Sequence, residues 1–183
     1  MQSKLSDPTP LGLAAFGITT GLLACVNAGF FPIGSPILAQ AIFVGGLVQL
    51  IVGIMEFVKG STFDSVSFCC FGGFWLSYAA FDILPALGFA AAPSAALLGT
   101  FMLIWAIFVF LLLVGVFKGG RLLTVVDTTL FIVLILLAFS YYLDSIVLVR
   151  IAGWVGIVCG ASALYFGCAI TLFETKGRQV LPY

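Results

Sequence analysis

The sequence predicts an all-α membrane protein, a six-transmembrane-helix bundle with both termini cytoplasmic. Three observations predict it: the composition, six long apolar segments and an uneven distribution of basic residues. Of the 183 residues, 63% are hydrophobic and 8% are charged, whereas a soluble domain carries about 25% charged residues. A chain this apolar cannot bury enough of its surface in water, so lipid must be its solvent.

Proline, glycine and charged residues divide the chain into six segments near the length of about 20 apolar residues that a bilayer requires. We place the spans near 10–31, 36–58, 66–88, 94–117, 122–143 and 148–173. The breaks between consecutive spans lie at 32–36, 59–62, 90–93, 118–121 and 144–145. Because these connections are short, we expect antiparallel neighbours in a single transmembrane domain covering residues 1–183.

The first span begins with an unusual entrance motif, Asp7-Pro8-Thr9-Pro10-Leu11-Gly12-Leu13. Pro8 and Pro10 cannot sit inside a helix, but they fit its first turn, where N–H groups have no helical partner. Asp7 is placed to cap those N–H groups and to face the positive end of the helix dipole. The motif therefore predicts an ordered, polar start to a membrane-length helix.

The basic residues predict the orientation. With six spans both termini share one side, and that side carries Lys4, Lys59, Lys118, Arg121, Lys176 and Arg178. The opposite side carries only Arg150. Cytoplasmic loops are enriched in Lys and Arg, so both termini are expected in the cytoplasm.

Polar residues recur at helical spacing within four spans. The stripes are Phe16, Thr20, Leu23 and Asn27; Gly45, Gln49, Val52 and Glu56; Ser67, Phe71, Phe74 and Tyr78, continuing to Asp82; and Asp127, Leu130 and Leu134. Such groups can join helices through hydrogen bonds, worth about 0.6–2 kcal/mol each. Together they favour a lumen that is wet at both ends and closed by Phe and Leu in the middle, as in pores with hydrophobic gates.

Other residues narrow the range of functions. The small residues of Gly17-x-x-x-Gly21 and Gly156-x-x-x-Gly160 allow backbones to pack closely, within one chain or between chains. The chain has no histidine, and its five cysteines form no Cys-x-x-Cys pair, so no metal site or cofactor is expected. No nucleophile–base pair indicates an enzyme, and a net charge of zero gives no reason to expect nucleic acid.

The entrance motif resembles the Asn-Pro-Ala-Pro-Leu-Gly-Leu signature of the acetate uptake transporter family, also called succinate–acetate permeases. The similarity continues along nearly the whole chain. It includes the stretches 27–31, 45–49, 59–63, 74–76, 152–156, 159–163 and 177–182, together with Glu56. The resemblance implies a homo-hexamer in the lipid bilayer, with a path for acetate, and in some members succinate, through each protomer.

The resemblance also implies a hydrophobic triad that narrows the path, and Phe16, Phe71 and Leu130 correspond to it by position. The helical stripes contain the same three residues. Two positions depart from the family pattern. Asp7 replaces the first Asn of the signature, and Phe71 stands where bacterial relatives often have Tyr. Both departures bear on the substrate range more than on the fold.

The resulting hypothesis is a channel or permease for small monocarboxylates in the inner (cytoplasmic) membrane. We expect neutral side chains, listed here, to bind the substrate: Thr19, Thr20, Asn27, Gln49 and Trp75. Glu56 would be the proton-coupling group of a proton-coupled carrier, whereas a passive channel needs none. The alternative is an acetate-responsive sensor or a structural membrane assembly protein without transport, which explains the small-residue packing but not the polar stripes.

Overall fold

The structure, a computed structural model, describes residues 6–116 and 120–182. The predicted basic residues Lys4 and Lys118 lie outside the described residues. The helical elements are α1 (Thr9–Ala28), α2 (Ser35–Gln40), η1 (Ala41–Val48, a π-helix), α3 (Gln49–Lys59), α4 (Thr62–Ala86), α5 (Ala95–Val116), α6 (Arg121–Tyr142) and α7 (Ile146–Lys176). No strand occurs within this described part of the chain.

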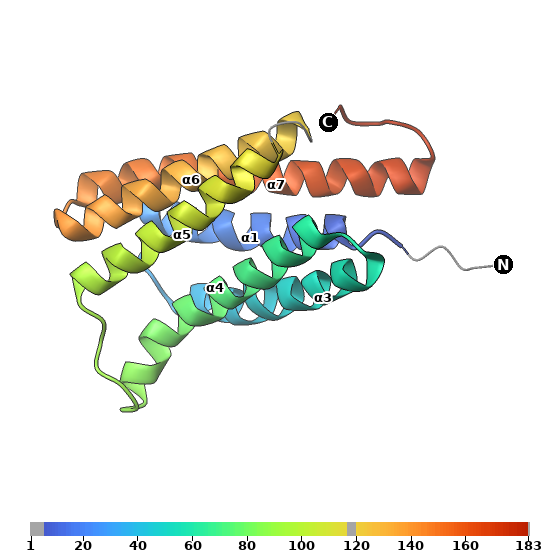
Figure 1. Ribbon diagram of the computed structural model, residues 1–183. Helices are drawn as coiled ribbons and strands as arrows, with labels where there is room; N and C mark the ends of the chain where they lie inside the picture. Colours follow the sequence, from blue (N-terminus) through green and yellow to red (C-terminus); the bar gives the residue numbers. More distant parts are fainter. Residues whose placement is uncertain (1–5, 117–119, 183) are drawn as a thin grey trace.

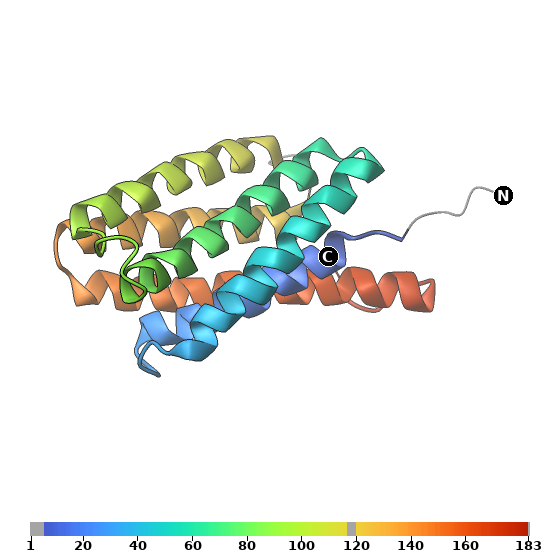
Figure 2. The same cartoon turned by 90° about the horizontal axis from the view of Figure 1, so that it is seen from below.

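Six helices are long and apolar enough to cross a membrane, because α2, η1 and α3 run on as one span, Ser35–Lys59. This confirms the predicted all-α bundle of six transmembrane helices. In Figure 1, α5, α6 and α7 form one group, α3 and α4 form another, and α1 runs between them. Seen from below in Figure 2, the span formed by η1 and α3 crosses α1 obliquely.

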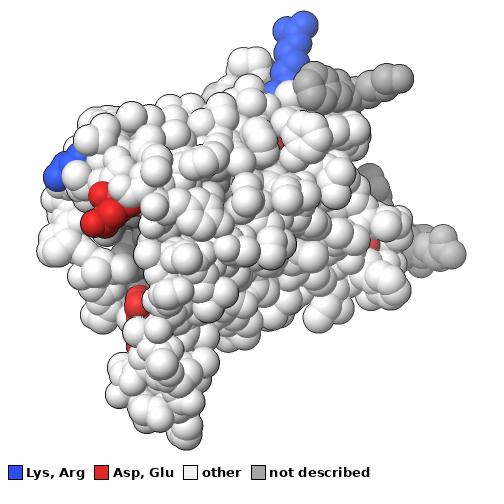
Figure 3. All heavy atoms as spheres, turned by 60° about the vertical axis from the view of Figure 1, so that its left-hand side comes forward, with Lys and Arg blue, Asp and Glu red and all other residues white. Residues whose placement is uncertain are grey.

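The outer surface fits lipid contact. Large apolar side chains are exposed along the spans, for example Phe57 on α3, Leu111 on α5 and Trp154 on α7. Figure 3 shows charged side chains gathered toward the ends of the molecule, with a broad uncharged surface between them. In water this surface would cost free energy, whereas hydrocarbon covers it without penalty.

The helix ends follow the breaks in the sequence. Pro10 lies in the first turn of α1, and the helix ends at Gly29, whose φ of 91° lies in the left-handed region. Gly60 ends α3 in the same way, with a φ of 90°. Only glycine adopts this conformation without strain, and its N–H then bonds to carbonyls of the last turn. Pro85 lies one residue before the last residue of α4, Ala86.

The π-helical segment η1 is a feature that the sequence pattern did not indicate. Gly45 lies in it, and a Cβ placed there would come within 2.7 Å of both Thr19 Cγ2 and Trp75 Cγ. The glycine therefore lets η1 lie directly against α1 and α4. A π-turn has i→i+5 bonds, yet Gly45 of η1 and Gln49, Val52 and Glu56 of α3 are all buried.

The glycines of α1 and α7 form a close helix–helix contact within the chain, which we call the glycine contact and define as Gly17, Gly21, Gly156 and Gly160. A Cβ on Gly17 would lie 2.7 Å from the Gly160 carbonyl oxygen, and one on Gly160 would lie 2.7 Å from the Gly21 nitrogen. A Cβ on Gly156 would lie 2.9 Å from Ala24 Cβ. The sequence left open whether these glycines pack within or between chains, and here they pack within one.

We predict that Gly160→Ala destabilises the protein, because the added methyl meets backbone atoms that cannot move aside. Overpacking of this kind costs about 1–3 kcal/mol, so the midpoint of thermal unfolding in detergent should fall. Gly21→Ala is the matched control, since a Cβ there meets nothing within 4 Å. That change should leave the midpoint unchanged or raise it, because alanine favours helix by about 1 kcal/mol. Equal losses in both variants would contradict the glycine contact.

Candidate functional site

Three cavities follow one another along α1. The proximal cavity, of about 160 Å³, lies at the beginning of α1 and is lined by Thr9, Ser67 and Asp127 among others. The central cavity, of about 50 Å³, shares Phe16 and Phe71 with it. The distal cavity, of about 260 Å³, lies toward the other end of the bundle. The residues that line both the central and the distal cavity are Leu23, Asn27, Phe74 and Leu137.

A hydrophobic neck separates the proximal cavity from the central one. We define the neck as Phe16 of α1, Phe71 of α4 and Leu130 of α6, all of which line the central cavity. The ring centroids of Phe16 and Phe71 lie 5.5 Å apart, and no neck residue is more than 8% exposed. The structure thus brings together the three residues that helical spacing and family resemblance had both singled out.

The central cavity is small and almost entirely apolar, with few hydrogen-bonding groups. Its volume of about 50 Å³ is room for about three water molecules. Thr20 Oγ1 and Trp75 Nε1 are buried there without a hydrogen-bond partner among the described residues. Asn27 lies at the border with the distal cavity. Unpaired buried donors are costly, so these groups are suited to bind an acceptor that enters the cavity.

Two of the expected substrate-binding residues lie elsewhere. Thr19 donates its hydroxyl to the Ala15 carbonyl at 2.8 Å and lines none of the cavities described here. Gln49 is fully buried, and its side-chain amide has no partner within the described residues. It does not line these cavities either, because its span packs against α1 and α4. Gln49 is buried on the same face as Gly45, Val52 and Glu56, as the helical count placed it, but that face contacts helices and not a cavity.

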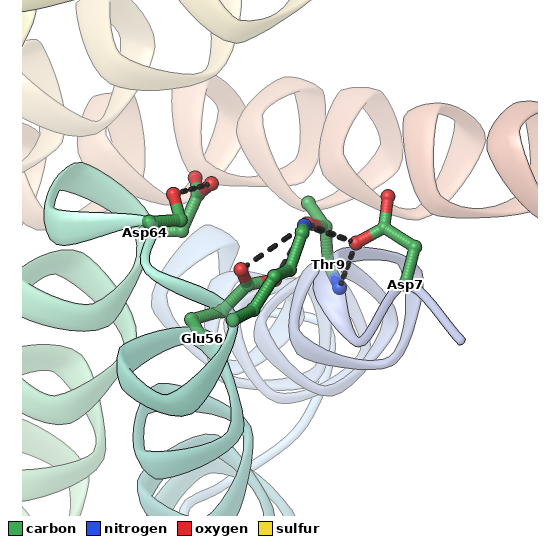
Figure 4. Close-up of polar contacts among 6 residues, drawn as sticks. Asp7, Thr9, Glu56 and Asp64 are labelled. Atoms are coloured by element: carbon green, nitrogen blue, oxygen red, sulfur yellow. Dashed lines mark hydrogen bonds and ion pairs between the residues drawn. The ribbon is translucent and has the colours of Figure 1, made fainter. Parts of the chain in front are cut away.

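The entrance motif is held by a polar cluster at the start of α1 (Figure 4). Asp7 Oδ1 accepts hydrogen bonds from Thr9 N at 3.1 Å, Thr9 Oγ1 at 2.8 Å and Lys59 Nζ at 2.7 Å. Glu56, which is fully buried, places Oε1 2.7 Å from Thr9 Oγ1 and Oε2 3.1 Å from Lys59 Nζ. The Thr9 hydroxyl has one proton, so it donates to one of the two carboxylates at a time. The cluster ties α1 to α3.

The remaining motif residues support this entrance. Pro8 is buried at the helix start, and Pro10 occupies the first turn. A Cβ on Gly12 would lie 2.5 Å from the Phe68 ring, so the glycine lets α4 approach α1. Glu56 lines none of the cavities, although its partner Thr9 lines the proximal one.

The proximal cavity contains two carboxyl groups. Asp64 accepts a hydrogen bond from Ser61 Oγ at 2.6 Å. Asp127 is 4% exposed, and its Oδ2 has no hydrogen-bond partner within the described part of the chain. None of the described residues that line this cavity is Lys or Arg. The sequence placed Asp127 on one helical face with Leu130 and Leu134, and in the structure it lines the proximal cavity.

Trp105 is a path residue that sequence reasoning missed. It lies on α5, lines the central cavity and packs edge-on against Phe74 with ring centroids 5.1 Å apart. The fourth predicted span has no polar stripe, so periodicity did not single it out. A tryptophan in the middle of an otherwise aliphatic and phenylalanine-rich span was the available signal.

Six membrane-length helices around a succession of cavities with a hydrophobic neck define a multi-pass membrane protein of the channel or carrier type. The model of the GPR1/FUN34/yaaH family matches residues 1–181. The chain is 41% identical over 180 residues to the succinate-acetate/proton symporter SatP of Escherichia coli K12, covering 98% of this chain and 96% of that protein. This chain therefore belongs to the GPR1/FUN34/yaaH family.

Two further comparisons concern a eukaryotic relative and a solved structure. Acetate permease A of Emericella nidulans is 37% identical over 121 residues, which are 60% of this chain and 41% of that one. The solved structure of the bacterial acetate channel SatP matches with a TM-score of 0.96 and 41% identity, covering 98% of this chain and 99% of that chain. The helical arrangement is thus shared over nearly the entire length.

We predict a pH-dependent contribution of Asp7 to stability. Partial burial raises its pKa, but hydrogen bonds from Lys59 and Thr9 outweigh burial, and the pKa of Asp7 lies below the usual 3.8. A carboxyl group whose pKa is lower in the folded state than in the unfolded state stabilises the fold at pH values above the unfolded-state pKa. This stabilisation is lost as the pH falls through the folded-state pKa. Asp7→Asn should therefore cost up to about 1 kcal/mol at neutral pH.

Thermal unfolding of the wild type and Asp7→Asn near pH 7 and near pH 3 measures this contribution. The difference between the two midpoints should shrink at the acidic pH. Glu174→Gln is the control, because it removes an exposed carboxylate near the end of α7. A midpoint difference that is independent of pH would show that Asp7 acts only as a neutral cap.

Proposed function

We propose that this chain is a membrane channel or permease for small monocarboxylates, acetate first and succinate second, with one path through each protomer. The succession of proximal, central and distal cavities along the bundle, with the neck of Phe16, Phe71 and Leu130 between the first two, carries the proposal. The relatives named as acetate and succinate transporters support the substrate class. No catalytic role is part of this proposal.

In this proposal the path selects by size and by weak, neutral binding. The neck excludes larger solutes and hinders free water, because apolar constrictions dewet. A carboxylate oxygen that reaches the central cavity meets the free donors of Thr20 and Trp75, with Asn27 beyond them. Neutral donors bind weakly enough for release, which rapid passage requires.

The proposal also covers the membrane, the oligomeric state and the orientation of the protein. It is a single transmembrane domain of residues 1–183 in the inner membrane, and it assembles as a homo-hexamer that buries part of the exposed apolar surface. Both termini lie in the cytoplasm. Lys59, Arg121 and Lys176 support this orientation, because they lie at the end of the bundle where the described chain begins, opposite Arg150.

Flux of labelled acetate into liposomes that contain only this protein tests the function. We expect uptake well above that of empty liposomes for acetate, and weaker uptake for succinate. Competition by unlabelled formate and lactate gives the substrate range. Flux equal to that of empty liposomes for all four acids would overturn the proposal and favour a non-transporting membrane protein.

We predict that widening the neck changes selectivity. Leu130→Ala removes part of the constriction, so flux of lactate should rise relative to acetate by about threefold or more, because one methylene of size discrimination in an apolar pocket is worth about 1–3 kcal/mol. Phe16→Ala should act in the same direction. Leu111→Ala is the matched control, because Leu111 is 63% exposed on the outside of α5. An unchanged lactate-to-acetate ratio in both neck variants, with normal expression, would refute the role of the neck.

A further inference from the structure

The proximal cavity contains a buried carboxyl group, that of Asp127, which has no role in the proposed function described above. Asp127 lies on α6 one helical turn before the neck residue Leu130, and it lines the same cavity as Phe16 and Phe71. Asp127 is 4% exposed, and its Oδ2 has no hydrogen-bond partner among residues 6–116 and 120–182. It is therefore an unpaired acidic group that faces the path immediately before the neck.

A charged carboxylate in this position would be expensive. An ionised group buried without a counter-ion costs several kcal/mol or more, and the described lining of the cavity contains no Lys or Arg. The other buried carboxyl at this end of the bundle, Glu56, has the Lys59 ammonium at 3.1 Å and a hydrogen bond from Thr9. Asp127 has neither kind of support, so its neutral, protonated form is the one that these surroundings favour.

The neck and the central cavity also favour the uncharged form of the substrate. The described residues that line the central cavity include no charged side chain, and its polar groups are the neutral side chains of Thr20, Asn27 and Trp75. An anion that crossed this segment would lose its hydration without gaining a positive partner. A protonated carboxylic acid crosses at much lower cost and still offers a carbonyl oxygen to the free donors.

We propose that Asp127 is the proton-exchange residue of the path, which protonates a carboxylate in the proximal cavity so that the neutral acid crosses the neck. This inference rests on the proposed transport function. In the step, the O–H bond of the Asp127 carboxyl breaks and an O–H bond forms on the substrate carboxylate. Asp127 is left as a carboxylate, and a proton taken from the bulk solution and relayed through the proximal cavity then reprotonates it. In the reverse direction, the emerging acid returns its proton to Asp127.

Other titratable groups on the helices near Asp127 have partners of their own. Asp64 of α4 lines the same cavity, but it accepts a short hydrogen bond from Ser61. Cys159 of α7 is fully buried, and its thiol donates to the Val126 carbonyl at 3.5 Å. On the α1 and α3 side, the carboxyls of Asp7 and Glu56 both pair with the Lys59 ammonium. Of the described groups, Asp127 alone combines burial, an unpaired oxygen and a place on the path.

The test uses the pH dependence of acetate flux in liposomes. A simple carboxylic acid with a pKa of about 4.5 is neutral in only about 0.3% of its molecules at pH 7. Asp127→Asn should therefore reduce protein-dependent flux by about tenfold or more near pH 7. Near pH 4.5, where the neutral acid is abundant in solution, the same variant should lose less than about twofold. Asp127→Glu, which keeps the carboxyl, should restore flux at pH 7.

Two controls separate this role from others. Glu174→Gln removes a carboxyl outside the path and should leave both flux values unchanged. Asp64→Asn tests the neighbouring carboxyl of the same cavity and should not reproduce the pH-selective loss. A loss in Asp127→Asn that is equal at both pH values would indicate a structural role and overturn the proposal. Unaltered flux at pH 7, or the pH-selective loss in Asp64→Asn instead, would also overturn it.

An infrared measurement keeps the proposal testable even if Asp127→Asn folds poorly. Wild-type protein in lipid near pH 7 should show the C=O stretch of a protonated carboxyl, and this band should shift in Asp127→Glu and vanish in Asp127→Asn. Absence of the band from the wild type would overturn the proposal while leaving transport intact. Absence of wild-type flux for every acid would overturn the proposed function, and this inference with it.

Discussion

The close contact between α1 and α7 is the constraint on which the rest of the structure depends. Gly17 and Gly160 bring the two backbones together at a distance that no side chain permits. In lipid, where helices gain little from the hydrophobic effect, such van der Waals packing holds them together. Because one face of α1 is fixed against α7, the adjacent face is turned toward the central cavity, which α4 and α6 also line. That face carries Phe16 and Thr20, which line the path.

The path follows from the cost of placing polar groups in an apolar protein. Hydrocarbon offers no hydrogen bonds, so polar side chains must lie where they find partners or water. Thr20 and Asn27 lie along the cavities, and the carboxyls of Asp7 and Glu56 share Lys59 at the start of α1. The short central segment stays apolar, which makes charge the main barrier to passage. The fold therefore favours small solutes that can shed their charge.

Sequence reasoning succeeded where helices are regular. The stripes on the first, third and fifth spans place Phe16, Phe71 and Leu130 on faces that the structure brings to one cavity. On the second span the predicted stripe of Gly45, Gln49, Val52 and Glu56 is buried along one face, but that face packs against neighbouring helices and lines none of the cavities described above. Sequence reasoning also missed Trp105, since a span that is apolar on every side has no periodic signal.

The sequence by itself determined that this chain is a membrane protein of six helices, where those helices begin and end to within about four residues, and which family it belongs to. These properties depend on local composition, on proline and glycine, and on motifs that are continuous in the chain. Only the tertiary structure decided that the glycines pack within one chain, that Glu56 pairs with Lys59 away from the cavities, and that Asp127 faces the path unpaired. Burial and pairing depend on contacts between residues far apart in sequence, and no local pattern records them.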